Sequence, residues 1–285
     1  MDAIAKQAGK IGHTSNLFYT EPPARLAEIL CKRTGMSSVF FANGGGEANE
    51  GMIKLARKYS FDKYGKGRHK ILTLVNSFHG RTLCTLSATG QDVFHNYFFP
   101  FVEGFDYVTA NDIADLEAKL DDTVCAVMLE YIQGEGGVNA LEQAFVDAVF
   151  EKCAAKDVLV IADEVQTGVG RTGTFLAGEQ FGHKADVTTL AKGIAGGLPM
   201  GACLANEKCA GVLGKGLSWL YIRRQSGMLC RRSGSAEHHY RRRLSGRSAA
   251  ESQAAAGEAG KAGRRGERQR SGTDDRHCPQ GQESH

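Results

Sequence analysis

In the sequence VLVIADEVQTG, residues 158–168, an apolar run of strand length is followed at once by Asp163 and Glu164. A short continuous apolar run bounded by polar residues is typical of a strand buried on both faces of a parallel sheet. Four further runs of this kind occur at residues 39–42, 71–75, 126–129 and 187–190. We therefore expect a central sheet built from these runs.

Helical patterns separate the runs. Met52, Leu55, Ala56 and Tyr59 recur at the spacing of one helix face, and residues 144–155 repeat the pattern just before residues 158–168. Strands that alternate with helices predict βαβ units. The fold class we expect is therefore α/β, with a mainly parallel central sheet flanked by helices.

Glycine and polar residues follow every run, which places them together at one edge of the predicted sheet. They occupy residues 43–47, 76–82, 130–137, 163–168 and 191–193. Ligands of open parallel sheets bind outside the carboxyl ends of the strands. A functional site is therefore expected at this edge.

Three features of the edge each have a functional and a structural interpretation. The glycines at 44–46 precede a predicted helix. They form either a phosphate-binding site made of free backbone N–H groups or a flexible turn between strand and helix. Asp163 needs a partner after its apolar strand, either a protonated pyridine nitrogen or a helix cap or salt bridge. Lys192 is either a surface charge or, if partly buried, a neutral amine that forms Schiff bases. Together with an aromatic side chain, these are the groups that pyridoxal phosphate requires.

Three motifs are specific in order and spacing: SFHGRT at 77–82, DEVQTG at 163–168 and TLAKG at 189–193. With them the chain resembles the class III (ornithine-type) pyridoxal-phosphate-dependent aminotransferases, most closely their acetylornithine aminotransferase branch, over residues 4–215. The resemblance implies the large domain of a fold-type I transferase and a homodimer. It also implies transfer of an amino group from acetylornithine or a similar ω-amino donor to 2-oxoglutarate, a step of arginine biosynthesis.

The resemblance assigns roles around the cofactor. Lys192 would hold pyridoxal phosphate as a Schiff base and, once released, would move the proton at the donor Cα. Asp163 would keep the pyridine nitrogen protonated, and Gln166 would hydrogen-bond the ring oxygen. Val165 and Phe78 would pack on the two faces of the ring.

Further roles concern the phosphate and the substrate. The phosphate contacts would come from three backbone positions, Gly44, Gly45 and Gly46. Arg81 corresponds to the family arginine that pairs with a substrate carboxylate in a fork geometry. Glu135, or else Glu130, corresponds to the glutamate that neutralises a second substrate-binding arginine.

The chain departs from the family pattern in several places. Family members usually have Ser and Ala or Thr where this chain has Gly44 and Gly46, and Pro where it has Tyr131. The N-terminal segment and the C-terminal small domain of the family have no counterpart here. We therefore expect residues 1–214 to form an incomplete large domain.

Residues 215–285 have a different composition. They carry 15 Lys and Arg against 7 Asp and Glu, whereas residues 1–214 carry 20 against 25. From residue 223 onward, Leu229 and Leu244 are the only Leu, Ile, Val or Phe residues, too few to bury a core. We expect a basic disordered tail, through which nucleic-acid binding is an alternative function, although aromatic residues are not interleaved.

A frameshift would explain this change of composition. The family continues after residue 215 with the segment HGSTFGGNP, and suitable codons for residues 218–226 spell that segment when read one base out of frame. We interpret the chain from about residue 217 as an out-of-frame translation. Sequencing the coding DNA tests this, because the codons of residues 218–226 must spell the family segment in a shifted frame. An inactive fragment that at most binds the cofactor or a full-length partner is then the alternative to an active enzyme.

The composition argues against a membrane protein, a secreted protein and a metal-binding protein. No apolar run approaches the roughly 20 residues of a membrane span, and residues 1–12 lack the apolar core of a secretory signal. The eight cysteines form neither a Cys-x-x-Cys pair nor a zinc-binding spacing. We expect a cytoplasmic protein without a membrane partner or a bound metal.

Overall fold

The computed structural model describes residues 2–13 and 18–214. The expected disordered tail and the expected out-of-frame segment, within residues 215–285, lie outside the described residues. The chain begins with helices α1 (Asp2–Lys10) and α2 (Glu21–Thr34) and then enters the sheet. Of the helices that the structure describes, none combines the length and the hydrophobicity needed to cross a bilayer.

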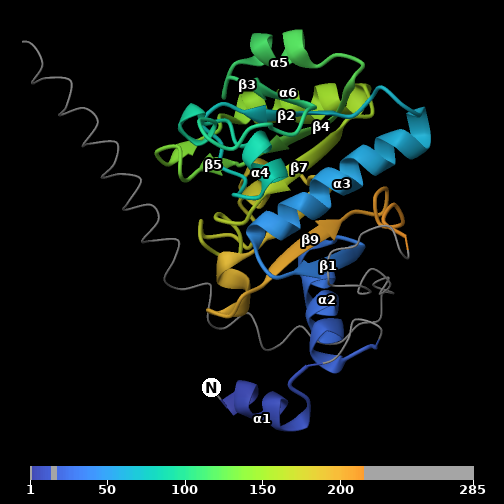
Figure 1. Ribbon diagram of the computed structural model, residues 1–285, viewed down its shortest axis with the longest axis vertical. Helices are drawn as coiled ribbons and strands as arrows, with labels where there is room; N and C mark the ends of the chain where they lie inside the picture. Colours follow the sequence, from blue (N-terminus) through green and yellow to red (C-terminus); the bar gives the residue numbers. More distant parts are fainter. Residues whose placement is uncertain (1, 14–17, 215–285) are drawn as a thin grey trace, which may run out of the picture. The chain divides into compact units, whose positions relative to one another are not determined.

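A mainly parallel sheet forms the centre of the fold (Figure 1). Its strands are, in spatial order, β1 (Ser38–Ala42), β9 (Gly201–Ala205), β8 (Val187–Leu190), β7 (Leu159–Asp163), β4 (Val124–Leu129), β2 (Lys70–Leu74) and β3 (Phe105–Val108). β9 pairs antiparallel with β1 and β8, and the other pairs are parallel. β1 therefore runs in the same direction as β8, so all five predicted strands end at one edge, where β9 begins. The predicted α/β class and mainly parallel sheet are confirmed.

Helix α3 (Gly45–Tyr64) packs on one face of the sheet, across which it runs in Figure 1. Its side chains Met52 and Ala56 are buried in one cluster with Met128 of β4 and Ile161 of β7. The predicted amphipathic helix therefore exists, and the face that its spacing indicated is the buried one.

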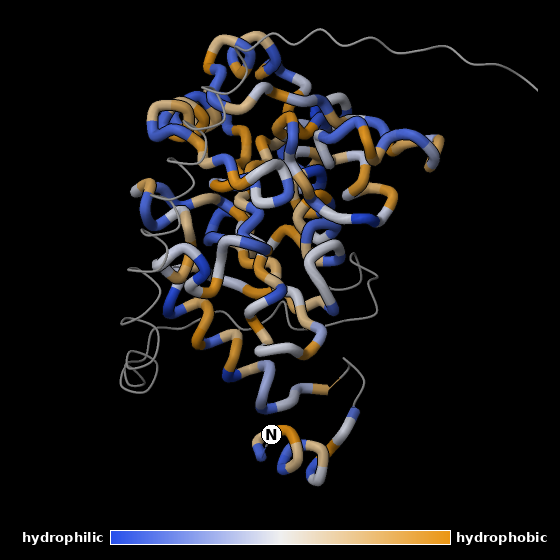
Figure 2. Tube along the Cα trace, turned by 90° about the vertical axis from the view of Figure 1, so that its left-hand side faces the viewer, coloured by the Kyte–Doolittle hydropathy of each residue, from blue (hydrophilic) through white to orange (hydrophobic). Residues whose placement is uncertain are grey.

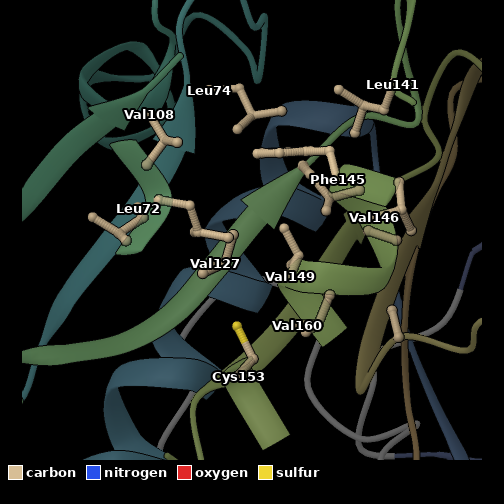
Figure 3. Packing of buried hydrophobic residues seen from close by; sticks show 14 of the residues in the cluster. Leu72, Leu74, Val108, Val127, Leu141, Phe145, Val146, Val149, Cys153 and Val160 are labelled. Atoms are coloured by element: carbon tan, nitrogen blue, oxygen red, sulfur yellow. The ribbon is translucent and has the colours of Figure 1, made fainter. Parts of the chain in front are cut away.

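Helices α5 (Ile113–Lys119) and α6 (Gln143–Ala155) supply the second hydrophobic layer. Phe145 and Val149 of α6 lie against Val127 and Val160, the strand neighbours of the residues that face α3 (Figure 3). Successive strand residues point to opposite faces, so both faces of β4 and β7 are buried. β4 and β7 are buried along their whole length. Figure 2, coloured by hydropathy, shows orange hydrophobic stretches of the tube among the described residues.

Two strands of the central sheet, β3 and β9, carry no clear sequence signal and were not predicted. β3 lies at the sheet edge and alternates half-buried aromatic and acidic residues, and β9 consists mostly of small residues with weak strand preference. Between β7 and β8 the structure has only the 3-10 turn η2 (Ala177–Phe181), so these two strands are not separated by an α-helix. The short elements are α4 (Leu83–Ala88), η1 (Asp92–Phe94), η3 (Lys192–Ala195) and the hairpin of β5 (Ile132–Gln133) with β6 (Asn139–Ala140).

Candidate active site

A cavity of about 420 Å³ lies at the carboxyl edge of the sheet. Its walls come from the segments that follow β1, β2, β4, β7 and β8 and from the segment that precedes β9. The predicted site residues that line it are Gly44, Gly45, Gly46, Phe78, Glu130, Glu135, Asp163, Val165, Gln166 and Lys192. This volume is within the range of small-molecule sites. The described residues hold no cluster of His, Cys, Asp and Glu arranged for a metal.

The glycine run forms the start of α3. Gly44 is the N-cap, and no side chain caps this end of the helix. The first N–H groups of a helix have no partner within the helix, so they are available to an anion. A Cβ at Gly45 would lie only 2.8 Å from Val165 Cγ1, so the missing side chain lets the helix approach the loop after β7.

A second glycine brings the loop after β2 against the same helix end. Gly80 has φ 136°, and a Cβ there would lie 2.6 Å from Thr85 Oγ1 and 3.2 Å from the Gly46 Cα. The loop is continued by α4, whose capping box joins Thr82 and Thr85. This arrangement holds Phe78, two residues before Gly80, at the cavity wall.

Asp163 ends β7 and is 3% exposed. Its Oδ2 accepts hydrogen bonds from His79 Nδ1 at 2.8 Å and from Asn49 Nδ2 at 2.7 Å. Its Oδ1 accepts from the Val165 N–H at 3.0 Å. The Thr189 hydroxyl lies 3.5 Å from Oδ1 but is closer to Asn49 Oδ1, at 2.8 Å, and it has a single hydrogen to donate. Since a carboxylate has about four acceptor sites, Oδ1 has capacity for one more donor when that hydrogen goes to Asn49. This carboxylate suits a ring N–H.

His79 and Asn49 line the cavity, although no role was predicted for either. Nothing in the described chain hydrogen-bonds His79 Nε2, a buried atom. Asn49 is 1% exposed, on the helix face that carries Met52. A polar residue on an apolar helix face was the available signal for Asn49, and the motif SFHGRT already contained His79.

Glu130 is a buried carboxyl group at the cavity wall, 5% exposed. Burial raises the pKa of Glu130 to about 7, and the charge of Asp163 adds to this effect. His79, the Phe78 N–H at 2.9 Å from Oε2 and the charge of Lys192 act in the opposite direction. The cavity therefore contains a carboxyl group that exchanges protons near neutral pH.

Gln166 and Glu135 form a polar pair on the wall after β4 and β7. Gln166 Nε2 donates to Glu135 Oε1 at 3.2 Å. A Cβ at Gly134 would lie 1.2 Å from Gln166 Oε1, so the amide occupies the space above the Gly134 backbone.

Two predicted residues are exposed. Lys192 follows β8 and begins η3, with φ 48°, and its side chain is exposed although it lines the cavity. The partial burial that was one of its two interpretations is therefore not seen. Arg81 is exposed and is not among the residues that line the cavity; its Cζ lies 5.8 Å from the centre of the Phe78 ring.

Comparisons with known proteins give a consistent result. The family model described as "Aminotransferase class-III" matches residues 1–219. The chain is 56% identical over 217 residues to the acetylornithine aminotransferase of Haemophilus ducreyi, covering 76% of this chain and 55% of that protein. It is 45% identical over 212 residues to the succinylornithine transaminase of Citrobacter koseri, covering 74% and 52%.

The fold comparison agrees with the sequence comparison. The crystal structure of the ornithine aminotransferase from Toxoplasma gondii superposes with a TM-score of 0.74 at 31% identity, covering 78% of this chain and 54% of that one. The chain thus spans about half the length of the relatives that it matches.

Proposed function

Because this chain belongs to the class-III aminotransferase family, we propose that it transfers an amino group from acetylornithine or a similar ω-amino donor to 2-oxoglutarate with pyridoxal phosphate as cofactor. The observation that carries the proposal is one cavity lined by Lys192, Asp163 and the uncapped start of α3. These groups supply an amine, a carboxylate and free N–H donors. The cofactor needs the same three for its aldehyde, its ring nitrogen and its phosphate.

The residues of the cavity fit the cofactor on the grounds of their own chemistry. The N–H groups at the start of α3, from Gly44 to Gly46, would bind the phosphate, because a helix N-terminus favours negative charge. Asp163 Oδ1 has an acceptor site for a ring N–H. Phe78 and Val165 offer apolar surface for the ring faces, and Gln166 offers an amide for the ring oxygen.

When bound, pyridoxal phosphate supplies a ring that accepts electrons from the carbon that bears the amino group. The protein supplies the proton transfers and the charges around that ring. Lys192 would attach the cofactor covalently. As a free amine it would accept the proton from the donor carbon that bears the reacting amino group and deliver it to the cofactor carbon. Asp163 would keep the ring nitrogen in its charged form.

Substrate carboxylates need cationic partners. We propose Arg81 for this role, because a guanidinium forms two parallel hydrogen bonds with a carboxylate. Its exposed position beside Phe78 leaves it free to turn toward a bound substrate. Glu135, or else Glu130, would hold a second arginine in its place.

A homodimer is the assembly we propose. Exposed apolar side chains gather in residues 93–102, next to the cavity, where Phe94 contacts Phe78 with ring centres 5.6 Å apart. Apolar side chains in such a group are typical of protein contacts.

A donor panel tests the proposed reaction. The 285-residue chain with pyridoxal phosphate and 2-oxoglutarate should form glutamate from acetylornithine, succinylornithine or ornithine. Lys192→Ala should abolish turnover, whereas Lys54→Ala, which removes an exposed lysine of α3, should not change it. Cofactor binding without turnover of any donor would favour the alternative of an inactive fragment over an active enzyme.

A further inference from the structure

Asn49 makes three buried hydrogen bonds at the centre of the cavity wall. Its Nδ2 donates to Asp163 Oδ2 and to the His79 carbonyl oxygen, both at 2.7 Å. Its Oδ1 accepts from Thr189 Oγ1 of β8 at 2.8 Å. Both amide hydrogens are used, and the amide oxygen has a donor. Buried amides with complete partners have a single favoured orientation.

The two acceptors beside Nδ2 select this orientation of the amide, and the Thr189 hydroxyl completes it as a donor to Oδ1. If the amide were reversed, its oxygen would face two acceptors, the Asp163 carboxylate and the His79 carbonyl. The Thr189 hydroxyl is fully buried and lies 3.5 Å from Asp163 Oδ1, so its hydrogen is better used by Asn49 at 2.8 Å. Thr189 thereby supports Asn49 with a third hydrogen bond, and Asn49 binds one oxygen of Asp163.

We infer that Asn49 is a positioning residue for cofactor binding, which it supports by hydrogen-bonding Oδ2 of Asp163 and so holding the carboxylate in one orientation, with Oδ1 left for the cofactor. The inference rests on the proposed function, because it assumes that Asp163 binds the ring nitrogen of pyridoxal phosphate. Asn49 lies in α3, outside the three motifs, and the proposed function assigns it no role.

Asn49 also links helix α3 to Asp163. The same helix offers its uncapped N-terminus to the phosphate, four residues before Asn49. One side chain thus joins the element at the phosphate end of the cavity to the carboxylate at the ring end. Without Asn49, Asp163 would lose a donor in a buried setting, where ionised groups depend on their hydrogen bonds.

The test measures the dissociation constant of pyridoxal phosphate for the full 285-residue chain and its variants. Asn49→Leu should raise the dissociation constant by about tenfold or more, the loss expected for one hydrogen bond to a charged group. Thr189→Val should weaken binding in the same direction but less. Thr188→Val is the matched control, because Thr188 is buried on the opposite face of β8.

Two readouts separate positioning from a general effect on folding. In an Asp163→Asn background, Asn49→Leu should cause no further loss of affinity, because the two residues act as one unit. The variant Asn49→Asp should bind weakly at pH 8 and recover as the pH falls toward 5, because the introduced carboxyl group becomes a donor to Asp163 only when it is protonated. Urea unfolding of the cofactor-free variants reports any loss of fold.

The outcomes distinguish this inference from the function on which it rests. If the wild-type chain binds pyridoxal phosphate and Asn49→Leu binds it equally well, the role of Asn49 is overturned and the proposed function stands. Additive losses in the double variant would also overturn it. A wild-type chain that binds no pyridoxal phosphate would overturn both.

Discussion

At the scale of single residues, Gly134 decides where the amide of Gln166 lies. A side chain at position 134 would occupy the place of Gln166 Oε1, since a Cβ there would lie 1.2 Å from it. The Gln166 side chain is flexible, so a methyl group would displace the amide rather than unfold the loop.

We predict that Gly134→Ala and Gln166→Ala each weaken binding of pyridoxal phosphate by about tenfold, because both variants would lose the proposed hydrogen bond to the ring oxygen. The urea midpoint of the cofactor-free chain should hardly change. Fluorescence titration measures the affinity. Gly51→Ala is the control, because its Cβ would lie at an ordinary contact distance of 3.6 Å from Phe40. Wild-type affinity in Gly134→Ala would show that Gln166 makes no such bond.

The buried carboxyl group of Glu130 makes stability depend on pH. Burial raises the pKa of Glu130 from its ordinary 4.5 to about 7, so the folded chain binds this proton more tightly than the unfolded chain. The resulting stabilisation is fully present below pH 4.5 and is lost as the pH rises through 7.

We therefore predict that Glu130→Gln, which keeps an acceptor for the Phe78 N–H, reduces the loss of stability between pH 5 and 8. The gain relative to wild type should reach at most about 3 kcal/mol in the free energy of unfolding. Urea unfolding of both cofactor-free chains across this pH range measures it. Parallel pH curves for the two chains would contradict the prediction.

Sequence position alone predicted most residues of the cavity, for a physical reason. Residues directly after parallel strands share one edge, so Phe78, Glu130, Asp163 and Lys192 had to lie near one another. Asn49 could not be found in this way, because it lies inside a helix and reaches Asp163 only through the packing of that helix. The exposure of Lys192 also depends on tertiary structure.

At the scale of elements, Asp157 joins the end of α3 to the turn between α6 and β7. It accepts hydrogen bonds from Lys63 Nζ at 2.7 Å, from Lys208 Nζ at 2.8 Å and from the Tyr64 hydroxyl. Partial burial opposes its charge, but the hydrogen bonds from Lys208, Lys63 and Tyr64 outweigh this and lower the pKa of Asp157.

We predict that Asp157→Asn lowers the free energy of unfolding by about 1 kcal/mol at pH 7. Asn tolerates the φ of 51° at this position, so the variant removes the charge without straining the backbone. Because the folded-state pKa is lowered, the difference from wild type should shrink as the pH falls below 3.8. Asp62→Asn, which breaks a single exposed pair with Lys58, should have a smaller effect. Equal effects of the two variants in urea unfolding would contradict this.

The elements that could be predicted are those whose burial leaves a pattern in the sequence. β4, β7 and β8 are buried throughout. β4 and most of β7 appear as apolar runs, β8 carries β-branched residues between Val187 and Leu190, and α3 and α6 show helical spacing. β9 is also buried throughout, but its small residues carry little strand preference. Its pairing between β1 and β8 is decided by the sheet as a whole, so no local pattern could have revealed it.

At the scale of the whole molecule, residues 93–102 form the surface that we propose for the homodimer. Tyr97 is 82% exposed and Phe99 70% exposed, and the segment continues through Phe94 to the cavity wall at Phe78. A second copy that covered these side chains would also lie close to the cavity.

We predict that the double substitution Tyr97→Ser and Phe99→Ser converts the dimer to a monomer at micromolar concentration, because it removes apolar area from the contact. Sedimentation velocity measures the change. Phe61→Ser, which alters an exposed apolar residue of α3, is the control and should leave the dimer intact. A dimer that persists in the double variant would exclude this surface.

We propose that Lys192 binds the aldehyde of pyridoxal phosphate at the edge of the sheet, in the cavity that Asp163 also lines. Borohydride reduction of the chain with bound cofactor, followed by proteolysis and mass spectrometry, tests it most directly. We predict a single phosphopyridoxyl group on the peptide that contains Lys192, and none in Lys192→Ala. Labelling of other lysines at equal levels, or no labelling of Lys192, would contradict the claim.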